Sequence, residues 1–307
     1  MFYNKLKNVI LGGLLIGLLV SSSLWAKPLK VVAITEDFAS IAKSIGAEHI
    51  EVSSLVWGSR NLHNFEPRPS MITRVKEADL LIRLGMGQDN WIMGLVQTAR
   101  NSRVFWGKTG HLDCSVEIQK LNVPTGQIDG RMGDVHAFGN PHYWLNPLNG
   151  KIIAKQIMER LIILDPSHQA VYQENYRIFC ASIDQKFKEW QKKTIPLQSY
   201  RIVTYHQVWN YFFDAFGLTC VGQLEPVPGV PPTTAHMMSL QKTLADQGAP
   251  TLLLMANFYP ENIGRPFAKR VGAKFVQVPS NVGENGIKSY TELFDYIIAS
   301  ILKETER

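Results

Sequence analysis

The eight histidines carry the most informative chemistry in this sequence of 307 residues. Three of them, His63, His142 and His206, lie in or beside segments that end predicted strands or open predicted helices. Neutral imidazole nitrogen is a good ligand for zinc, which takes four ligands in structural sites. Taken singly, each of the three also fits a capping or core histidine, so spacing alone does not decide between the two roles.

The elements that must position these side chains alternate between strands and helices. In the first part of the chain, short apolar runs alternate with amphipathic segments, the pattern of a mostly parallel sheet covered by helices. The predicted strands cover residues 29–34, 50–56 and 80–84, and the predicted helices cover residues 38–45 and 71–78. A polar segment follows at residues 126–139, and a loop of that length is usually functional or mobile.

Two long helices are predicted in the middle of the chain. Asn146 and Pro147 combine a side-chain cap with a proline at the first helical position, so a helix begins there and runs to about Leu164. Residues 165–167, Asp-Pro-Ser, end it, and an apolar stripe at three- and four-residue spacing predicts a second helix over residues 168–193. At about 1.5 Å per residue, this helix is about 40 Å long and can span two lobes.

After this helix the alternation restarts. The predicted strands cover residues 202–205, 218–222, 251–255 and 274–278, and the predicted helices cover residues 208–216, 234–247 and 290–303. We therefore expect an α/β protein of two Rossmann-like lobes joined by one long linking helix. The expected domains are an N-terminal lobe over residues 27–166, the linking helix over 167–195 and a C-terminal lobe over 196–307.

The three histidines occupy related places in this pattern. Ligands of doubly wound sheets bind beyond the carboxyl ends of the strands. His63 follows the strand that ends near Val56, and His206 directly follows the strand over residues 202–205. His142 lies just before the helix capped by Asn146. Loops from both lobes can therefore bring these side chains together in the cleft between the lobes.

The N-terminus has the order of a secretory signal peptide. Lys5 and Lys7 precede an apolar run over residues 9–20, and small polar residues lead to a cleavage point after Ala26. The run of about a dozen residues is shorter than the ~20 that span a bilayer. No cysteine follows it, so lipid attachment is not predicted. We expect residues 1–26 to direct export to the periplasm; an uncleaved anchor is the alternative.

Composition excludes some classes of function. The hydrophobic share of 45% and the charged share of 19% are ordinary for a globular protein, and no dense run of Lys or Arg indicates nucleic-acid binding. The net charge of +6 falls to +4 when the two lysines of the signal peptide are removed. Cys114, Cys180 and Cys220 match no zinc or haem spacing, and we predict no disulfide among them.

The segments around the histidines resemble those of a known family. Residues 63–70 read His-Asn-Phe-Glu-Pro-Arg-Pro-Ser, and residues 140–147 read Asn-Pro-His-Tyr-Trp-Leu-Asn-Pro. Both resemble ligand motifs of the zinc- and manganese-specific solute-binding proteins of ABC importers, and residues 205–218 and 225–236 are similar to the segments that follow in that family. The resemblance covers essentially the whole mature chain.

This resemblance implies a two-lobed fold, a rigid linking helix, a metal in the interlobe cleft and delivery to a membrane permease. It assigns the metal ligands to His63, His142 and His206. The chain departs from the family at the fourth ligand, usually an Asp after the last strand, because residues 278–283 around Ser280 contain no carboxylate. Water, Glu284 and Glu225 remain open as the fourth ligand.

The donor set favours zinc over manganese. Manganese-type members replace the third histidine by a carboxylate, and manganese prefers oxygen ligands. His206 therefore indicates zinc, although copper and nickel also bind imidazole. Binding requires neutral imidazole, so we expect affinity to fall below about pH 6.5.

The remaining histidines have weaker signals. His136 lies on the loop where zinc-type members carry a His-rich insertion, so both an accessory metal contact and a solvated loop stay open. His236 is interpreted as structural, while His49, His111 and His168 lie in surface-like contexts without a predicted partner.

Two other classes of function were weighed against metal capture. Three histidines with an open position also suit a metallohydrolase, but no His-Glu-x-x-His helix is present, so we expect no enzyme. An adhesion role is disfavoured because the sequence has no lipobox or cell-wall anchor. We expect a monomer whose partner is the permease.

Overall fold

The structure is a computed structural model that describes residues 27–58, 60–126, 133, 136–245 and 248–306. The predicted signal peptide, residues 1–26, lies outside the described residues. Within the described part of the chain, we find no helix with both the length and the apolar content to cross a membrane.

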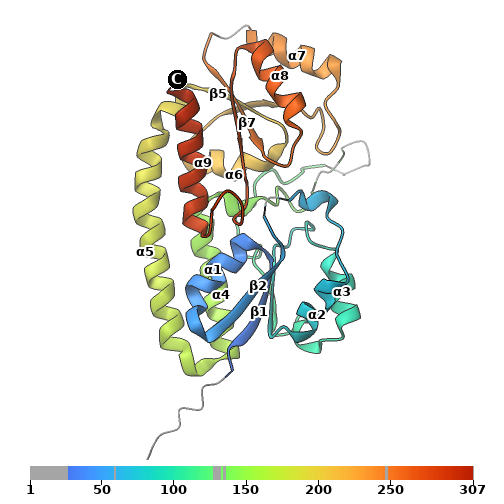
Figure 1. The fold of residues 1–307 in the computed structure, drawn as a ribbon, viewed down its shortest axis with the longest axis vertical. Coiled ribbons are helices and arrows are strands. Elements are labelled where there is room, and N and C mark those ends of the chain that lie inside the picture. The colour runs from blue at the N-terminus through green and yellow to red at the C-terminus, as the bar shows by residue number, and fades with distance from the viewer. Residues whose placement is uncertain (1–26, 59, 127–132, 134–135, 246–247, 307) are drawn as a thin grey trace, which may run out of the picture.

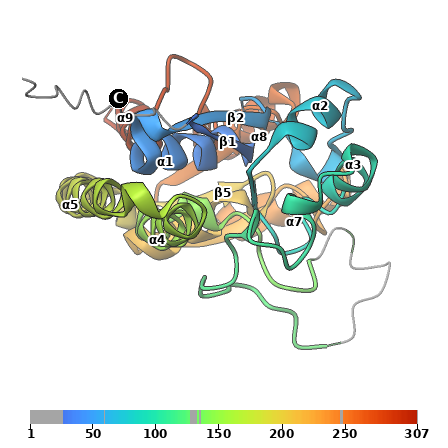
Figure 2. The ribbon, with the colours of Figure 1, turned by 90° about the horizontal axis from the view of Figure 1, so that it is seen from below.

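The N-terminal lobe is built on a parallel sheet of four strands in the order β2-β1-β3-β4. The strands are β1 (Leu29–Thr35), β2 (Ile50–Val56), β3 (Leu80–Arg83) and β4 (His111–Asp113), and the helices of this lobe are α1 (Glu36–Gly46), α2 (Ser70–Glu77) and α3 (Ile92–Ala99). Alternate side chains of β1 face opposite ways: Val31 and Ala33 pack toward α1, and Val32 and Ile34 pack toward α2 and α3. Figure 2 shows the two groups of helices on opposite sides of the sheet.

The C-terminal lobe repeats this topology with a parallel sheet in the order β6-β5-β7-β8. Its strands are β5 (Arg201–Thr204), β6 (Cys220–Gln223), β7 (Thr251–Ala256) and β8 (Lys274–Val278), and its helices are α6 (Asn210–Phe216), α7 (Thr234–Ala245) and α8 (Glu261–Val271). The central strand β7 is buried along its whole length, so helices cover both of its faces.

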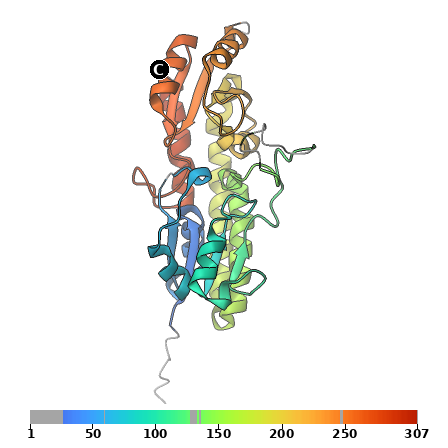
Figure 3. The same ribbon diagram turned by 90° about the vertical axis from the view of Figure 1, so that its right-hand side faces the viewer.

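Three longer helices run beside the lobes: α4 (Pro147–Leu164), α5 (Gln169–Thr194) and α9 (Tyr290–Thr305). As expected, Asn146 caps α4, since its side chain accepts a hydrogen bond from the backbone N–H of Leu148. Helix α5 extends alongside both lobes (Figures 1 and 3). It packs on α1 and α4 of the N-terminal half and on α9 of the C-terminal half. The predicted linking helix is therefore α5.

Single-turn 3-10 helices complete the described chain. They are η1 (Ala47–His49), η2 (Leu62–Asn64), η3 (Ser102–Val104), η5 (Tyr143–Leu145), η6 (Pro166–His168), η7 (Ile195–Ser199) and η8 (Gln207–Trp209). Helices α3 and α8 and strand β4 were not predicted from the sequence. The three cysteines are free, with Cys114 buried and Cys180 and Cys220 half-buried.

The two lobes share one interior. The main cluster of buried apolar side chains runs without a break from β1 to α9. Polar contacts reinforce the junction between the lobes, which we call the seam. Asp37 of α1 accepts hydrogen bonds from Asn281 Nδ2 at 2.7 Å and from the N–H of Val282 at 3.1 Å. Trp144 Nε1 donates to the carbonyl of Ser280 at 2.9 Å. These buried contacts fix the loop after β8 against the N-terminal lobe.

Candidate metal centre

His63, His142 and His206 converge where the two lobes meet. His63 lies in η2 after β2, His142 directly precedes η5, and His206 is the second residue after β5. Each offers one ring nitrogen to a group whose members all lie within 4.8 Å of one another. The placement follows from topology, because β2 and β5 both end at this junction and loops at the carboxyl ends of parallel strands form the binding crevice.

The ring spacing suits one shared ion. The ring centroids are separated by 5.5 Å for His63 and His142, 5.0 Å for His63 and His206, and 5.8 Å for His142 and His206. Imidazoles around a single tetrahedral ion, each with its nitrogen about 2 Å from the ion, have centroids about 5 Å apart. A small inward movement of His142 would therefore meet this geometry.

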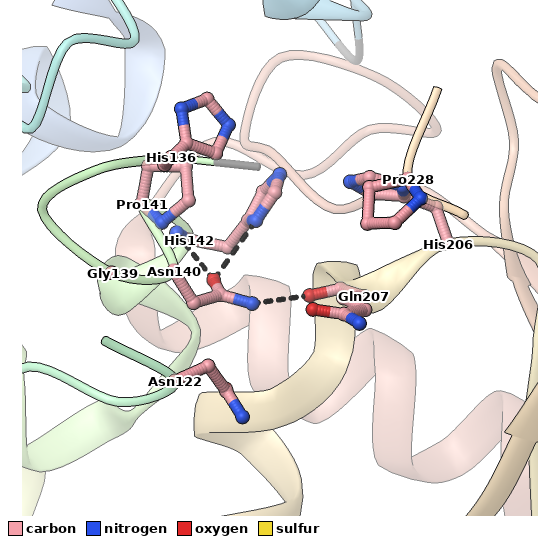
Figure 4. Close-up of a pocket in the computed structure, with 9 residues that line it drawn as sticks. All are labelled: Asn122, His136, Gly139, Asn140, Pro141, His142, His206, Gln207 and Pro228. Carbon is pink, nitrogen blue, oxygen red and sulfur yellow. Dashed lines mark hydrogen bonds between the residues drawn. The ribbon is translucent and has the colours of Figure 1, made fainter. Parts of the chain in front are cut away.

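Asn140 fixes the tautomer of His142 (Figure 4). Its Oδ1 accepts from the backbone N–H of His142 at 2.9 Å and lies 3.0 Å from His142 Nδ1. The amide Nδ2 donates to the carbonyl of Gln207 at 2.6 Å, which settles which end of the amide is oxygen. Nδ1 of His142 must therefore carry the proton, and Nε2 keeps the lone pair that a metal needs.

Glu225 plays the equivalent part for His206. Its Oε2 lies 2.7 Å from His206 Nδ1 and also accepts from the N–H of Gly229 at 3.0 Å. The side chains of His206 and Glu225 are only 5% and 8% exposed, so the contact is shielded from water. A carboxylate behind a ligating histidine orients the ring and raises its basicity toward the metal.

The environment favours the metal-binding form of His142. Burial first, and then the nearness of His63, His206 and His136, hold the pKa of His142 well below its ordinary value of 6.5. Bringing several imidazolium charges together in a buried site is unfavourable, so the neutral ring persists. A neutral ring is the form that coordinates a cation.

None of the carboxylates considered from the sequence joins the nitrogen group. Glu225 is held behind His206, and Glu284 accepts from Asn257 Nδ2. Ser280 is buried, with its hydroxyl donating to Asn281 Oδ1 at 2.9 Å. Among the described residues, the group contains only histidine nitrogen.

A small cavity of about 40 Å³ opens beside the histidines. Its lining brings His142 and His206 together with residues of the loop before Asn140 (Figure 4); the full set is Asn122, His136, Gly139, Asn140, Pro141, His142, His206, Gln207 and Pro228. The ring of His136 lies 5.0 Å from that of His63. His136 itself is half-buried at this cavity, while Ala137 and Phe138 of the same loop are exposed.

The other histidines lie outside the group. His111 was expected at the surface, but it is buried on β4 with Nδ1 2.9 Å from the carbonyl of Val104. His49 and His168 stack with centroids 3.8 Å apart, and His168 Nδ1 lies 2.6 Å from Asp165 Oδ2, so the expectation that they lack partners was also wrong. His236 Nε2 lies 2.9 Å from the carbonyl of Gln223, as a structural histidine should.

Comparison with known proteins identifies the family. Residues 31–304 match the family model described as ZnuA, zinc-uptake complex component A periplasmic. The chain belongs to this family. Membership in a family of solute-binding proteins confirms that the chain is not an enzyme.

Two similar proteins from other organisms are described as manganese-binding. The chain is 30% identical over 256 residues to the manganese ABC transporter substrate-binding lipoprotein PsaA of Streptococcus pneumoniae, covering 78% of each chain. It is 32% identical over 196 residues to PsaA of Streptococcus anginosus, a match that covers 62% of this chain and 60% of that protein. The chain thus spans less than two thirds of the latter relative.

Solved structures confirm the two-lobed fold. A crystal structure of ZnuA is 20% identical, with a TM-score of 0.74, and covers 91% of this chain and 99% of that chain. A manganese-bound periplasmic metal-binding protein from candidatus Liberibacter asiaticus is 17% identical, with a TM-score of 0.73 and coverage of 90% and 99%. These likenesses support the architecture, and the chemistry of the site has to be argued from its own residues.

Proposed function

We propose that the chain captures zinc in the periplasm through His63, His142 and His206 and delivers it to the permease of an ABC importer. The observation that carries the proposal is a group of three histidine nitrogens that lie within 4.8 Å of one another. Among the described residues, no carboxylate oxygen belongs to this group. Zinc accepts nitrogen ligands readily, whereas manganese favours oxygen. The neutral state of His142 and the carboxylate behind His206 support the same assignment.

Manganese is the second candidate, because the PsaA relatives are described as manganese proteins. Equilibrium dialysis of the metal-free protein against each ion separates the two. We expect one zinc ion bound per chain, and we expect manganese to be displaced by equimolar zinc. Tight manganese binding that zinc does not displace would contradict the proposal.

The ligand assignment is tested by the double variant His63→Ala, His206→Ala. Two of three nitrogens are then missing, so zinc binding at this site should be lost. His236→Ala is the matched control, because it removes an imidazole bonded to the Gln223 carbonyl outside the group and should bind zinc as the wild type does. A double variant that keeps wild-type binding would overturn the assignment.

Export is a separate part of the proposal. If residues 1–26 are a cleaved signal peptide, the protein recovered from the periplasm should begin at Lys27, which intact-mass measurement can establish. We also expect the mature protein to be a monomer. A mature mass that includes residues 1–26 would indicate an uncleaved anchor.

A further inference from the structure

We propose that His136 is the fourth metal ligand and closes the coordination sphere when zinc binds. The proposal rests on the proposed function, since it presumes that the other three histidines hold the ion. The first observation is the position of the His136 ring. Its centroid lies 5.0 Å from the centroid of the His63 ring, the same separation as between His63 and His206. That spacing is the one expected for two imidazoles on one tetrahedral zinc ion.

His136 faces the metal group across the small cavity. It lines this cavity together with His142 and His206, and its Nε2 atom is buried. Its nitrogens lie outside the group of three within 4.8 Å, so ligation requires the ring to move inward. Rotation about the two side-chain bonds of histidine moves a ring nitrogen by several ångströms, and the cavity supplies the room.

The segment that carries His136 is anchored on its C-terminal side. The N–H of Gly139 donates to the carbonyl of His136 at 3.1 Å, which closes a turn, and the N–H of Asn140 donates to the carbonyl of Leu121 at 2.8 Å. Gly139 has φ +95°, and a Cβ there would lie 2.7 Å from the Leu121 carbonyl oxygen. Glycine is therefore needed at this position for the close approach. His136 is thus tied to Asn140, which orients His142.

Gly133, the described residue that precedes His136 in the chain, lies against the C-terminal lobe. Gly133 has φ +66°, and a Cβ there would collide with the carbonyl oxygen of Pro228. Pro228 lies in the turn between Glu225 and Gly229, which are joined by a hydrogen bond behind His206. Gly133 thus contacts the turn that supports His206, and Gly139 contacts Leu121 beside Asn140, which supports His142. The hydrogen bonds of Gly139 and Asn140 on the C-terminal side of His136 limit the entropy lost when this loop ligand binds an ion.

The other candidates for the fourth position are engaged elsewhere. Glu225 supports His206, Glu284 is bonded to Asn257, and Ser280 is bonded to Asn281. A water molecule is the remaining competitor, because the cavity of about 40 Å³ is large enough to hold one. The test must therefore distinguish a fourth nitrogen from an oxygen.

X-ray absorption at the zinc edge, on the purified mature protein loaded with one equivalent of zinc, makes that distinction because the outer-shell scattering of each bound imidazole ring counts the histidine ligands. We expect four nitrogen neighbours in the wild type, and three nitrogens with one oxygen in His136→Ala. Competition with a chelator should show that His136→Ala binds zinc at least ~10-fold more weakly, yet still one ion per chain. His168→Ala, which removes an imidazole at the junction of α4 and α5, is the control and should match the wild type in both measurements.

Two results would overturn the inference: three nitrogens and one oxygen in the wild type, or wild-type affinity in His136→Ala. Failure of the proposed function looks different, because the wild type itself would then take up no zinc at one ion per chain. Weaker binding in His136→Ala with an unchanged count of four nitrogens would also contradict a direct ligand role.

Discussion

At the scale of single residues, the histidines of this site differ in what stands behind them. Asn140 supports His142 with a neutral amide, and Glu225 supports His206 with a carboxylate. A charged acceptor withdraws the ring proton more strongly, so His206 should be the more basic donor toward the metal. His142, held neutral by burial, is the ligand that needs no charged partner. Burial thus keeps His142 neutral, while Glu225 orients the ring of His206.

The carboxylate behind His206 leads to a test. In Glu225→Gln the side chain keeps its size but loses its charge, so His206 becomes a weaker donor and zinc affinity should fall by about 10- to 100-fold. Competition titration with a chelator measures this. Glu284→Gln is the control, since that carboxyl bonds Asn257 outside the nitrogen group. Unchanged affinity in Glu225→Gln would show that the contact does not act on the metal.

At the scale of elements, the loop after β8 is held by α1. Asp37 at the start of α1 is fully buried and bonds Asn281 and Val282 of this loop. Burial raises the pKa of Asp37 from 3.8 to about 6, although the hydrogen bonds from Asn281 and Val282 act against the rise. The loop that usually supplies a carboxylate ligand in the family is here a structural clasp between the lobes.

This clasp predicts a pH dependence of stability. Between pH 3.8 and about 6 the folded protein holds a proton on Asp37 that the unfolded chain has released. The contribution of Asp37 to the free energy of unfolding is therefore lost as pH rises through this window, by up to about 3 kcal/mol. Urea unfolding of the metal-free protein at several pH values should show this loss of unfolding free energy with rising pH in the wild type and not in Asp37→Asn.

His142 and His111, whose pKa values are lowered mainly by burial, contribute with the opposite sign, so the difference between wild type and Asp37→Asn is the quantity to follow. Asp184→Asn is the matched control, because that carboxyl is half exposed and pairs with Lys151. Its unfolding curves should follow the wild type across the window. Parallel pH profiles for wild type and Asp37→Asn would rule out the clasp as a titrating group.

Elements with strong periodicity were predictable from sequence. The predicted strand bounds 50–56 and 274–278 agree with β2 and β8, and the capped helix beginning at Pro147 ends at Leu164 as expected. Helix α8 was missed because Gly264 and Pro266 interrupt it; Gly264 is required there, since a Cβ would collide with the sulfur of Met255. That requirement is tertiary and leaves no local signal.

The metal site was also predictable in part. Placing His63, His142 and His206 at strand and helix ends sufficed to bring them together, because sheet topology determines where loops meet. The position of His136 depends on the turn that Gly139 closes, and the close contact of Gly139 with Leu121 leaves no local signal in the sequence. Glu225 follows β6, the neighbour of β5, so strand order could have revealed its closeness to His206.

At the scale of the whole molecule, two sheets of the same strand order face a shared junction. Helix α5 runs along both, and the apolar interior is continuous across the seam. Opening the lobes would expose this interior and break the bonds of Asp37 and Trp144. The architecture favours small local movements over a wide hinge motion.

Solution scattering tests this rigidity. Profiles of the metal-free and zinc-loaded mature protein should superimpose, with the same radius of gyration, because the seam and α5 hold the lobes at one distance. Any change should be confined to the site loops, which hydrogen exchange would locate as added protection around His63 and His136. A clear compaction on zinc binding would contradict a rigid seam.

The position of α9 has a consequence for how the chain acquires its fold. The N–H of Tyr290 donates to Ser40 Oγ, and its hydroxyl donates to the carbonyl of Trp144, so the last helix completes the interior of the first lobe. Contacts between residues 250 positions apart form late, since closing so long a loop is entropically costly. During synthesis, the interior of the N-terminal lobe is therefore completed only after α9, the last helix, has been made. A chain cut before Tyr290 should therefore remain only partly ordered in both lobes, including the N-terminal lobe, whose own strands and helices are all still present.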